Sequence, residues 1–240
     1  MHSFRLRVRA LLAAVPLLSA AGSVRAELYS FYVIGNSPNA VNAAIGQSQL
    51  FFEVTAATVG GNSGVKFHFT NTGPAASSIT DIYFDDGHLL NLASVTNGPS
   101  VLFYQQQTGN PVTPGNLPGG STLNPPFVAT QGFSADSNPP VQPNGVNPGE
   151  WVDIFFTLKN GATLADVIAD LAADPNAWNS LRVGIHVQGF DNGGSESFVN
   201  NPAPVPVPAP AAAGLGALGL LLATWAKRRG RHQDAKARTM

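Results

Sequence analysis

Apolar and polar residues alternate in several short runs between residues 28 and 199, with Gly, Pro, Asn and Asp between the runs. The clearest runs are residues 50–54, 65–69 and 181–187. A period of two places apolar side chains on one face of a strand and polar side chains on the other, and the separating residues favour turns. The pattern therefore predicts an all-β domain, an antiparallel β-sandwich or jelly roll, over residues 27–201.

Two dipeptides that favour tight turns, Asp86-Gly87 and Asn97-Gly98, lie between apolar runs. Such dipeptides tolerate the positive φ angles that close a two-residue hairpin. We therefore expect residues 78–106 to form a three-stranded meander, in which each strand pairs with the next along the chain.

One segment departs from the period of two and predicts a helix. Its apolar residues recur at the spacing of one helix face: Leu164, Val167, Ile168 and Leu171. Thr163, with Asp166 three residues later, makes a capping-box start. We expect one short helix over residues 163–171, packed across an open end of the sandwich. The stretches 108–126 and 136–149 are rich in Gly, Pro and Asn and predict long surface loops.

Residues 1–26 have the order of a secretory signal peptide. Three arginines precede an apolar stretch over residues 10–21, and small or modest side chains follow at 24–26. Signal peptidase reads such a segment, so we expect a signal helix that is cleaved after Ala26. The apolar stretch is well short of the roughly 20 residues that span a bilayer, which argues against a permanent membrane helix there.

The formal net charge of −1 conceals a strong separation of charge along the chain. Between residues 27 and 202, 13 acidic residues stand against only Lys66, Lys159 and Arg182, which gives −10. Such a domain is not expected to bind nucleic acid, because phosphate contacts need clustered Lys and Arg. Cations or neutral sugars are better candidate ligands. The chain has no cysteine, so the core must stabilise an exported fold without disulfides.

Residues 202–240 contain a proline-rich run, an apolar stretch and a basic cluster, in that order. Proline at every second position over residues 202–210 predicts an extended stalk that cannot join a sheet. Residues 209–226 carry no charge and, as a transmembrane helix, would span roughly 27 Å. Trp225 lies at the depth where indoles prefer the interface. The positive-inside rule places the basic cluster in the cytoplasm and the β domain outside. That cluster is Lys227, Arg228, Arg229 and Arg231.

This three-part tail resembles the PEP-CTERM class of protein-sorting domains, in the variant with the motif Val-Pro-Leu-Pro-Ala. The matching residues are Val205, Pro206, Val207, Pro208 and Ala209, with valine in place of the leucine and no glutamate between the prolines. The resemblance implies recognition by an exosortase, a membrane cysteine protease-transpeptidase of Gram-negative bacteria that make exopolysaccharide. An uncleaved membrane anchor is the alternative interpretation.

Three stretches of the predicted ectodomain, residues 79–87, 132–151 and 185–190, are similar to stretches in uncharacterised surface proteins with this kind of tail. The likeness implies no activity. With the signal and the tail, it implies export through the inner membrane to the cell surface or extracellular matrix. The implied partners are an exosortase-type enzyme, the inner membrane and exopolysaccharide.

Asp81, Asp85 and Asp86 form the densest acidic group, and carboxylate oxygens are the ligands that Ca²⁺ prefers. Their spacing is not that of a calcium-binding loop, and on a strand Asp86 points away from the other two. A solvated hairpin edge is the competing interpretation. His68 and His186 could meet across neighbouring strands, but zinc needs three or four ligands and the sequence shows no third. We therefore expect no cofactor and no metal site, with calcium at Asp81, Asp85 and Asp86 as the alternative.

Motifs for nucleophilic catalysis are incomplete. Residues 193–197, Gly-Gly-Ser-Glu-Ser, lack the second glycine of a nucleophile elbow and predict a turn. Residues 117–120, Leu-Pro-Gly-Gly, are faintly similar to a Gram-positive sortase signal, but no apolar run follows, so we interpret them as loop. Glycoside hydrolysis needs two facing carboxylates, and nothing in the sequence pairs any two.

Two kinds of function follow for the domain. The first is a non-enzymatic structural or binding module of the cell surface or matrix. The alternatives are a carbohydrate-active enzyme or a calcium-dependent adhesin with the same tail. Carboxylates about 5 to 10 Å apart beside exposed aromatic side chains, such as Tyr104 or Trp151, would favour the enzyme. A buried Trp151 with scattered acids would favour the module.

Overall fold

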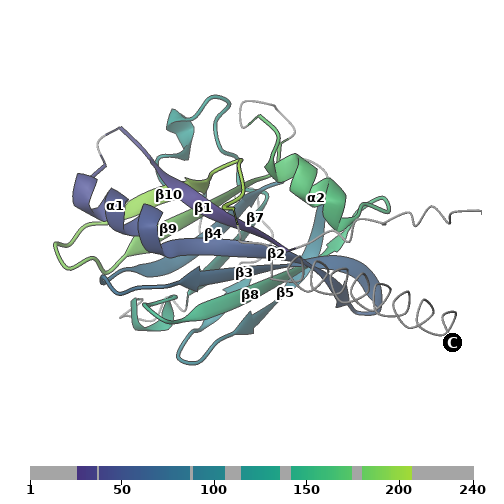
Figure 1. Cartoon of the computed structure of the whole chain (residues 1–240), viewed down its shortest axis with the longest axis horizontal. Helices are drawn as coiled ribbons and strands as arrows, with labels where there is room; N and C mark the ends of the chain where they lie inside the picture. Colours follow the sequence, from purple (N-terminus) through teal and green to yellow (C-terminus); the bar gives the residue numbers. More distant parts are fainter. Residues whose placement is uncertain are drawn as a thin grey trace, which may run out of the picture.

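The computed structural model of the protein describes residues 26–36, 38–86, 89–105, 115–135, 142–174 and 180–206. Their strands form one antiparallel sheet in the order β5-β8-β3-β2-β1-β10-β9-β4-β7-β6, with an α-helix at each end (Figure 1). The strands are β1 (Glu27–Ile34), β2 (Leu50–Val59), β3 (Asn62–Asn71), β4 (Ser78–Asp85), β5 (Leu90–Asn97), β6 (Phe103–Gln105), β7 (Gln131–Ala135), β8 (Trp151–Leu158), β9 (Arg182–Gln188) and β10 (Glu196–Asn200). The helices are α1 (Ala40–Gln49) and α2 (Leu164–Leu171), and two 3-10 turns are η1 (Gly120–Thr122) and η2 (Gln142–Asn144). The prediction of an all-β, antiparallel domain is confirmed.

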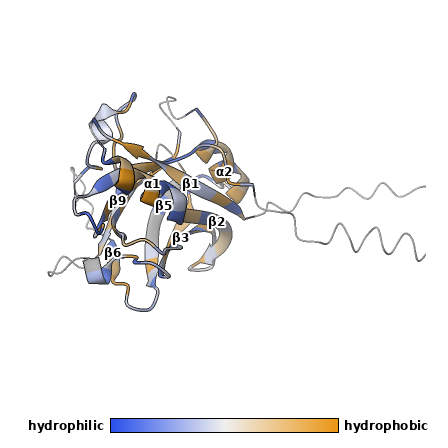
Figure 2. Ribbon diagram, turned by 60° about the vertical axis from the view of Figure 1, so that its left-hand side comes forward, coloured by the Kyte–Doolittle hydropathy of each residue, from blue (hydrophilic) through white to orange (hydrophobic). Residues whose placement is uncertain are grey.

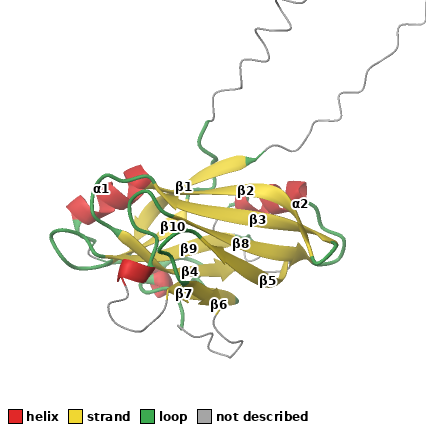
Figure 3. Ribbon diagram, turned by 90° about the horizontal axis from the view of Figure 1, so that it is seen from below, coloured by secondary structure: helices red, strands yellow, loops and turns green. Residues whose placement is uncertain are grey.

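The sheet curls until its two halves face each other, and β1 joins them (Figure 3). Residues 27–30 of β1 pair with β2, whereas residues 31–34 pair with β10. The two edge strands, β5 and β6, are linked through one side chain. The Asn97 amide donates to the carbonyl oxygen of Phe103 at 3.0 Å and accepts from its N–H at 2.8 Å. The sheet is therefore nearly closed, which leaves little free edge for another chain to pair with.

The alternating runs became strands as predicted, and burial alternates along them in β2 and β3. In β2 the side chains of Leu50, Phe52 and Val54 are fully buried, and the residues between them are partly exposed. Residues 65–69 lie in β3 and residues 182–187 in β9, and the apolar side chains of both strands face the same interior. In β9 the residues Arg182 and Gly184 of the other face are buried as well. Burial of the apolar face against the opposite half explains why this pattern folds as it does.

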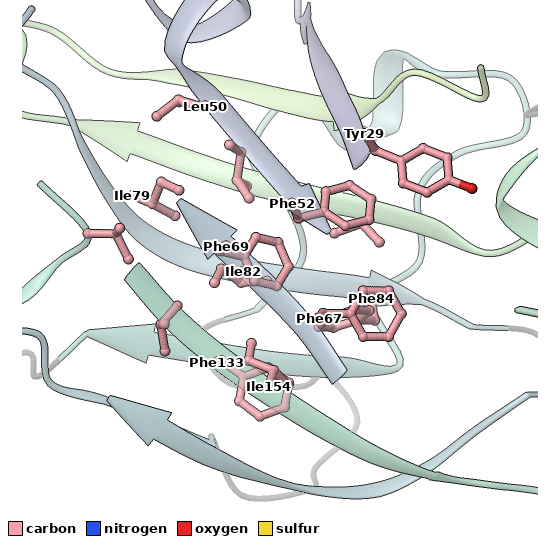
Figure 4. Close-up of a cluster of buried hydrophobic side chains, with 14 of the residues drawn as sticks. Tyr29, Leu50, Phe52, Phe67, Phe69, Ile79, Ile82, Phe84, Phe133 and Ile154 are labelled. Atoms are coloured by element: carbon pink, nitrogen blue, oxygen red, sulfur yellow. The ribbon is translucent and has the colours of Figure 1, made fainter. Parts of the chain in front are cut away.

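Aromatic rings fill the space between the two halves (Figure 4). Phe84 of β4 lies at their centre, with its ring centroid 4.8 Å from that of Phe156 and 5.0 Å from that of Phe67. It also meets Phe69 and Phe133, mostly edge to face. Such pairs stabilise by about 0.5–1.5 kcal/mol beyond their buried area. The interior of this fold is therefore an aromatic layer shared by both halves.

The predicted helix is confirmed as α2, and its start is the predicted capping box. The Thr163 side chain accepts from the Asp166 N–H, and the Asp166 carboxylate accepts from the Thr163 N–H at 2.7 Å. Leu164, Val167 and Leu171 join the main core at the end of the sheet. In Figure 2 this helix is largely orange, as expected for a helix that closes one end of a core.

The expectation of a single helix is wrong, because α1 precedes β2. Asn39 caps it by accepting from the N–H groups of Val41 and Asn42. A Cβ on Gly46 would lie 2.2 Å from the Phe198 ring, so glycine is needed where α1 packs on the sheet. The buried residues of α1 are small or polar, and Val41, one of its larger apolar residues, is exposed, so the 3.6-residue period was hard to see.

The expectation of a meander over residues 78–106 is also wrong. The three strands exist, but β4 pairs with β7 and β9, β5 pairs with β8, and β6 pairs with β7. The chain therefore crosses between the two halves after Asp86 instead of turning back beside β4. Turn dipeptides locate a change of direction, but they do not specify the partner strand.

The proline-rich run begins against the sheet and not clear of it. β10 ends at Asn200, which leaves carbonyl groups of β1 without a strand partner beyond that point. The Asn201 N–H donates to the carbonyl of Ser30 at 2.9 Å, and the Val205 N–H donates to that of Leu28 at 2.7 Å. Valine between two prolines supplies the N–H that proline lacks. The prediction that this run cannot join the sheet therefore fails for its first residues.

Among the described residues, no helix has the length and apolar character needed to cross a membrane. The signal over residues 1–25 and the apolar stretch over 209–226 lie outside the described residues. The same holds for Val207, Pro208, Ala209 and the basic cluster.

Two neighbouring residues of β8 test the aromatic layer. Phe156 is fully buried among Phe67, Phe84 and Phe133, whereas Phe155 is on the opposite face and is partly exposed. We expect Phe156→Ala to lower the free energy of unfolding by about 3–5 kcal/mol, because it opens a cavity in the core. Phe155→Ala should cost about 1 kcal/mol. Denaturant titration of the full chain measures both, and equal losses would contradict an aromatic core between the halves.

Candidate functional site

An open cleft of about 200 Å³ lies where β1 leaves the sheet towards α1. Four parts of the chain line it: Ile34, Gly35, Asn36 and Pro38; Pro118 and Gly119; His186; and Ser195, Glu196 and Ser197. His186 and Ser197 come from β9 and β10, so the sheet itself forms the base of the cleft.

The segment over residues 115–130 supplies one wall of the cleft. It packs on the outer face of the second half of the sheet, which consists of β10, β9, β4, β7 and β6. Leu117 and Phe127 are buried there with Tyr83 and Val199 in a second, smaller apolar cluster. Gly184 makes room for them, since a Cβ on it would lie 2.6 Å from the Leu117 side chain. The part of the predicted surface loop that the structure describes, residues 115–126, is therefore packed against the domain.

Arg182 holds this wall through a buried network. Its guanidinium donates to the carbonyl groups of Pro125 and Pro126, each at 2.8 Å, and lies over the Phe127 ring. Its Nε and Nη2 both donate to the Asp85 carboxylate. Burial raises the pKa of Asp85, although Val128 and Arg182 act in the opposite direction. The ion pair thus ties the wall to β4 at the cost of removing a carboxylate from water.

The base of the cleft belongs to a row of polar side chains that crosses four strands. Ser197, His186, Asp81 and Ser134 are successive register partners on β10, β9, β4 and β7. The His186 Nδ1 lies 3.1 Å from the Ser197 hydroxyl. Burial lowers the pKa of His186, with Asp81 and Glu196 acting in the opposite direction. Because an unperturbed histidine titrates at about 6.5, His186 is uncharged at neutral pH.

The rim of the cleft is fixed by α1 and by the turn that precedes β10. The Glu196 carboxylate accepts from the Asn39 N–H at 2.7 Å, and the Asn42 amide donates to the Gly193 carbonyl at 3.1 Å. Gly193 and Gly194 have φ angles of 74° and 81°. The turn itself lies at Asp191 and Asn192, residues 193–195 follow it as loop, and Glu196 and Ser197 are in β10, so the prediction of a turn over residues 193–197 is displaced by two residues and is wrong for the last two.

A serine beside a neutral histidine is the start of a nucleophile and base pair, but the third member of a triad is otherwise engaged. The Asp81 carboxylate accepts from the Ser134 hydroxyl at 2.5 Å and from the Thr80 hydroxyl at 3.0 Å. It carries no hydrogen bond to His186 among those that the structure describes. The arrangement is therefore better suited to hydrogen bonding with a ligand than to acyl transfer.

The three aspartates proposed for calcium have separate partners. Asp81 contacts Ser134 and Thr80, Asp85 contacts Arg182, and Asp86 accepts from the Lys159 ammonium at 3.2 Å. Within the described ranges no group of three potential metal-ligating side chains occurs. The three aspartates are close in sequence, but their carboxylates do not converge on one point.

The other sequence candidates are distributed over both halves. His68, on β3, lies 2.5 Å from an Asp153 oxygen and stacks near Trp151, whose side chain is partly exposed. His186 is on β9 in the other half, so the two histidines do not form a pair. Tyr104 is 39% exposed on the edge strand β6.

Sequence reasoning missed most of the cleft. The alternation over residues 181–187 placed His186 on an outer face, but residues 193–197 were interpreted only as a turn and Ser195 was not assigned to a site. Nothing local indicated that Gly35 and Pro118 would join them, since these contacts depend on long-range packing.

No protein-family model matches the chain, and comparisons with curated proteins and with solved structures likewise find no match.

The buried ion pair provides one test of the wall. We expect Arg182→Met to lower the free energy of unfolding by about 3–5 kcal/mol, because it leaves Asp85 and two carbonyl groups buried without their partner. Lys66→Met is the matched control: it removes the Lys66–Asp153 pair, 3.6 Å long and more exposed, at about 0–1 kcal/mol. Denaturant titration compares the two, and a loss of 1 kcal/mol or less in Arg182→Met would refute the role of the network.

The lowered pKa of His186 predicts a loss of stability in mild acid. Below about pH 6.5 the unfolded chain takes up a proton that the folded protein resists, so this contribution falls as pH drops through the folded pKa. His186→Gln should flatten the melting temperature between pH 7 and pH 5 relative to the wild type. His68→Gln is the control, and it should keep the decline in melting temperature that protonation of His186 causes. If the melting temperature fell equally with pH in the wild type and in His186→Gln, burial of His186 would make no contribution to the pH dependence of stability.

Proposed function

We propose that the chain is an exported, non-enzymatic module of a bacterial cell surface or extracellular matrix. In this proposal residues 1–26 direct export, and residues 202–240 hold the domain at the inner membrane until an exosortase-type enzyme processes the tail. The domain serves as a binding module or a structural one, with exopolysaccharide as a candidate partner. Its facing sheet halves support classing the fold as a β-sandwich of jelly-roll type.

The observation that carries the proposal is the position of the chain ends relative to the cleft. Val205 is hydrogen bonded to Leu28, so both ends of the domain leave the sheet side by side. The cleft lies at the opposite end of β1, beyond Ile34. Leu28 and Ile34 are six residues apart along β1, which separates the two by roughly 20 Å. A tail attached at the first end leaves the cleft directed away from the membrane.

The geometry favours a module over a carbohydrate-active enzyme. Asp81, Asp85 and Asp86 are engaged by separate partners, and Tyr104 and Trp151 belong to opposite halves of the sheet. A glycosidase would need two carboxylates that converge on one bond, beside a platform for the sugar.

Removal of the tail tests the proposed route. We expect deletion of residues 207–240 to release a folded domain into the periplasm or medium, because every described strand and the Val205 hydrogen bond are retained. Neutralising Lys227, Arg228, Arg229 and Arg231 to glutamine should weaken membrane retention at unchanged tail length, since these charges stop transfer. Cell fractionation with immunoblotting measures both variants.

Two results would count against this account. If the truncated protein stays on the surface, the domain and not the tail decides location. If mass spectrometry of the mature wild type shows an intact chain through Met240, the tail is a plain anchor and sorting by cleavage is wrong.

A further inference from the structure

We propose that the cleft beside His186 binds a neutral, hydroxyl-rich ligand of the size of one sugar ring, such as the terminal unit of an uncharged polysaccharide. This inference rests on the proposed function as a surface binding module and names the chemistry that the module recognises.

The size of the cleft sets the first limit. Pockets for drug-sized ligands measure about 300–1,000 Å³, whereas this cleft measures about 200 Å³. A single ring fits this space, but a helix or a folded peptide does not. Gly35 and Gly119 both line the cleft, and their φ angles of 113° and 75° favour glycine at these positions. Bare backbone therefore borders the entrance, where N–H and carbonyl groups can meet ligand hydroxyls.

The charge of the cleft sets the second limit. No lysine or arginine lines it, the Glu196 carboxylate does, and Asp81 is the register partner of His186. Both carboxylates repel an anion, so acidic sugars and phosphates are disfavoured. One carboxylate that already accepts from the Asn39 N–H is too few oxygen ligands for a calcium ion, which takes six to eight.

Hydrogen bonding then selects the ligand class. A neutral imidazole has one donor and one acceptor nitrogen, and in His186 one of them is engaged by Ser197. Whichever tautomer is present, the other nitrogen suits a hydroxyl, because a hydroxyl both donates and accepts. Ser195 and Asn36 add a second hydroxyl and an amide at the exposed rim. The polar groups that line this ring-sized space therefore match a neutral sugar.

The experiment follows the histidine rings of the full chain, purified in detergent, by side-chain ¹H–¹⁵N NMR. The probes are glucose, galactose and mannose, with glucuronate as the acidic match, glucosamine as the cationic match, and calcium chloride. We expect at least one neutral sugar to shift the His186 ring signals saturably while those of His68 stay in place. Glucuronate should bind more weakly, because it meets Glu196 and Asp81.

Two substitutions locate the binding. His186→Ala and Ser197→Ala should each weaken the binding of that sugar by up to about tenfold, as expected for the loss of one hydrogen bond. His68→Ala is the matched control and should bind as the wild type does. Melting curves report whether each variant folds, and the wild-type spectra decide the question if one does not. The proposal is overturned if no neutral sugar shifts His186, if glucuronate or glucosamine binds more tightly than every neutral sugar, or if only calcium shifts the ring.

Surface delivery separates this proposal from the one that it rests on. Ser197→Ala should reach the cell surface in wild-type amounts, because the tail is intact. Normal delivery of a wild-type protein that binds no neutral sugar would remove the ligand and leave the surface module. Absence of the wild-type protein from the surface would remove the proposed function, whatever the spectra show.

Discussion

The packing of aromatic rings between the two halves of the sheet is the constraint on which the rest of this structure depends. Phe84 meets rings from β3, β7 and β8, and Phe52 meets Tyr29 and Phe31 of β1 as well as Phe67 and Phe69. These contacts hold the sheet in its curled form, since a chain without cysteine has no covalent tie across the core. The curl in turn fixes the outer face on which the cleft is built. Among the described residues, the buried Tyr29 hydroxyl and the buried Asn42 amide oxygen have no hydrogen-bond partner, and burial raises the pKa of Tyr29 to about 12.

The outer face of the second half of the sheet is covered in a different way from the inner face. There a loop segment, not a strand, covers the sheet, and it is held by one arginine that bonds both a carboxylate and two carbonyl groups. This explains why Arg182 is almost fully buried in a domain with few basic residues. Polar residues that this segment does not reach, His186 and Ser197 among them, remain as the base of the cleft. The site is thus a consequence of where the covering segment ends.

Local sequence patterns were sufficient to predict most of the individual elements, but they were not sufficient to predict which strands pair. Alternation identified β2, β3 and β9, and the Thr163–Asp166 capping box identified α2. Strand faces and helix starts are specified by residues that are near one another in the sequence. The Asp86-Gly87 and Asn97-Gly98 dipeptides marked breaks but suggested the wrong neighbours, since β4 pairs with β9 about a hundred residues away. α1 escaped notice because its buried face consists of Asn42, Ala43, Gly46 and Gln49, none of which is a large apolar residue. The cleft escaped for the same reason as the pairing: its residues meet only after the sheet has closed.

The course of the last strand has a mechanical consequence. β10 runs from the turn beside the cleft to the point where the chain leaves along β1, and it is bonded on both sides, by β1 and β9. Tension applied between a ligand in the cleft and the chain beyond Pro206 would act along the axis of this strand. Hydrogen bonds of an antiparallel ladder lie across the strands, so that force would shear many of them together instead of opening them one at a time. In the described part of the chain, the bonds that Asn201 and Val205 make to β1 lie outside this arrangement and would yield first, which would lengthen the segment beyond β10 before the domain itself bears load.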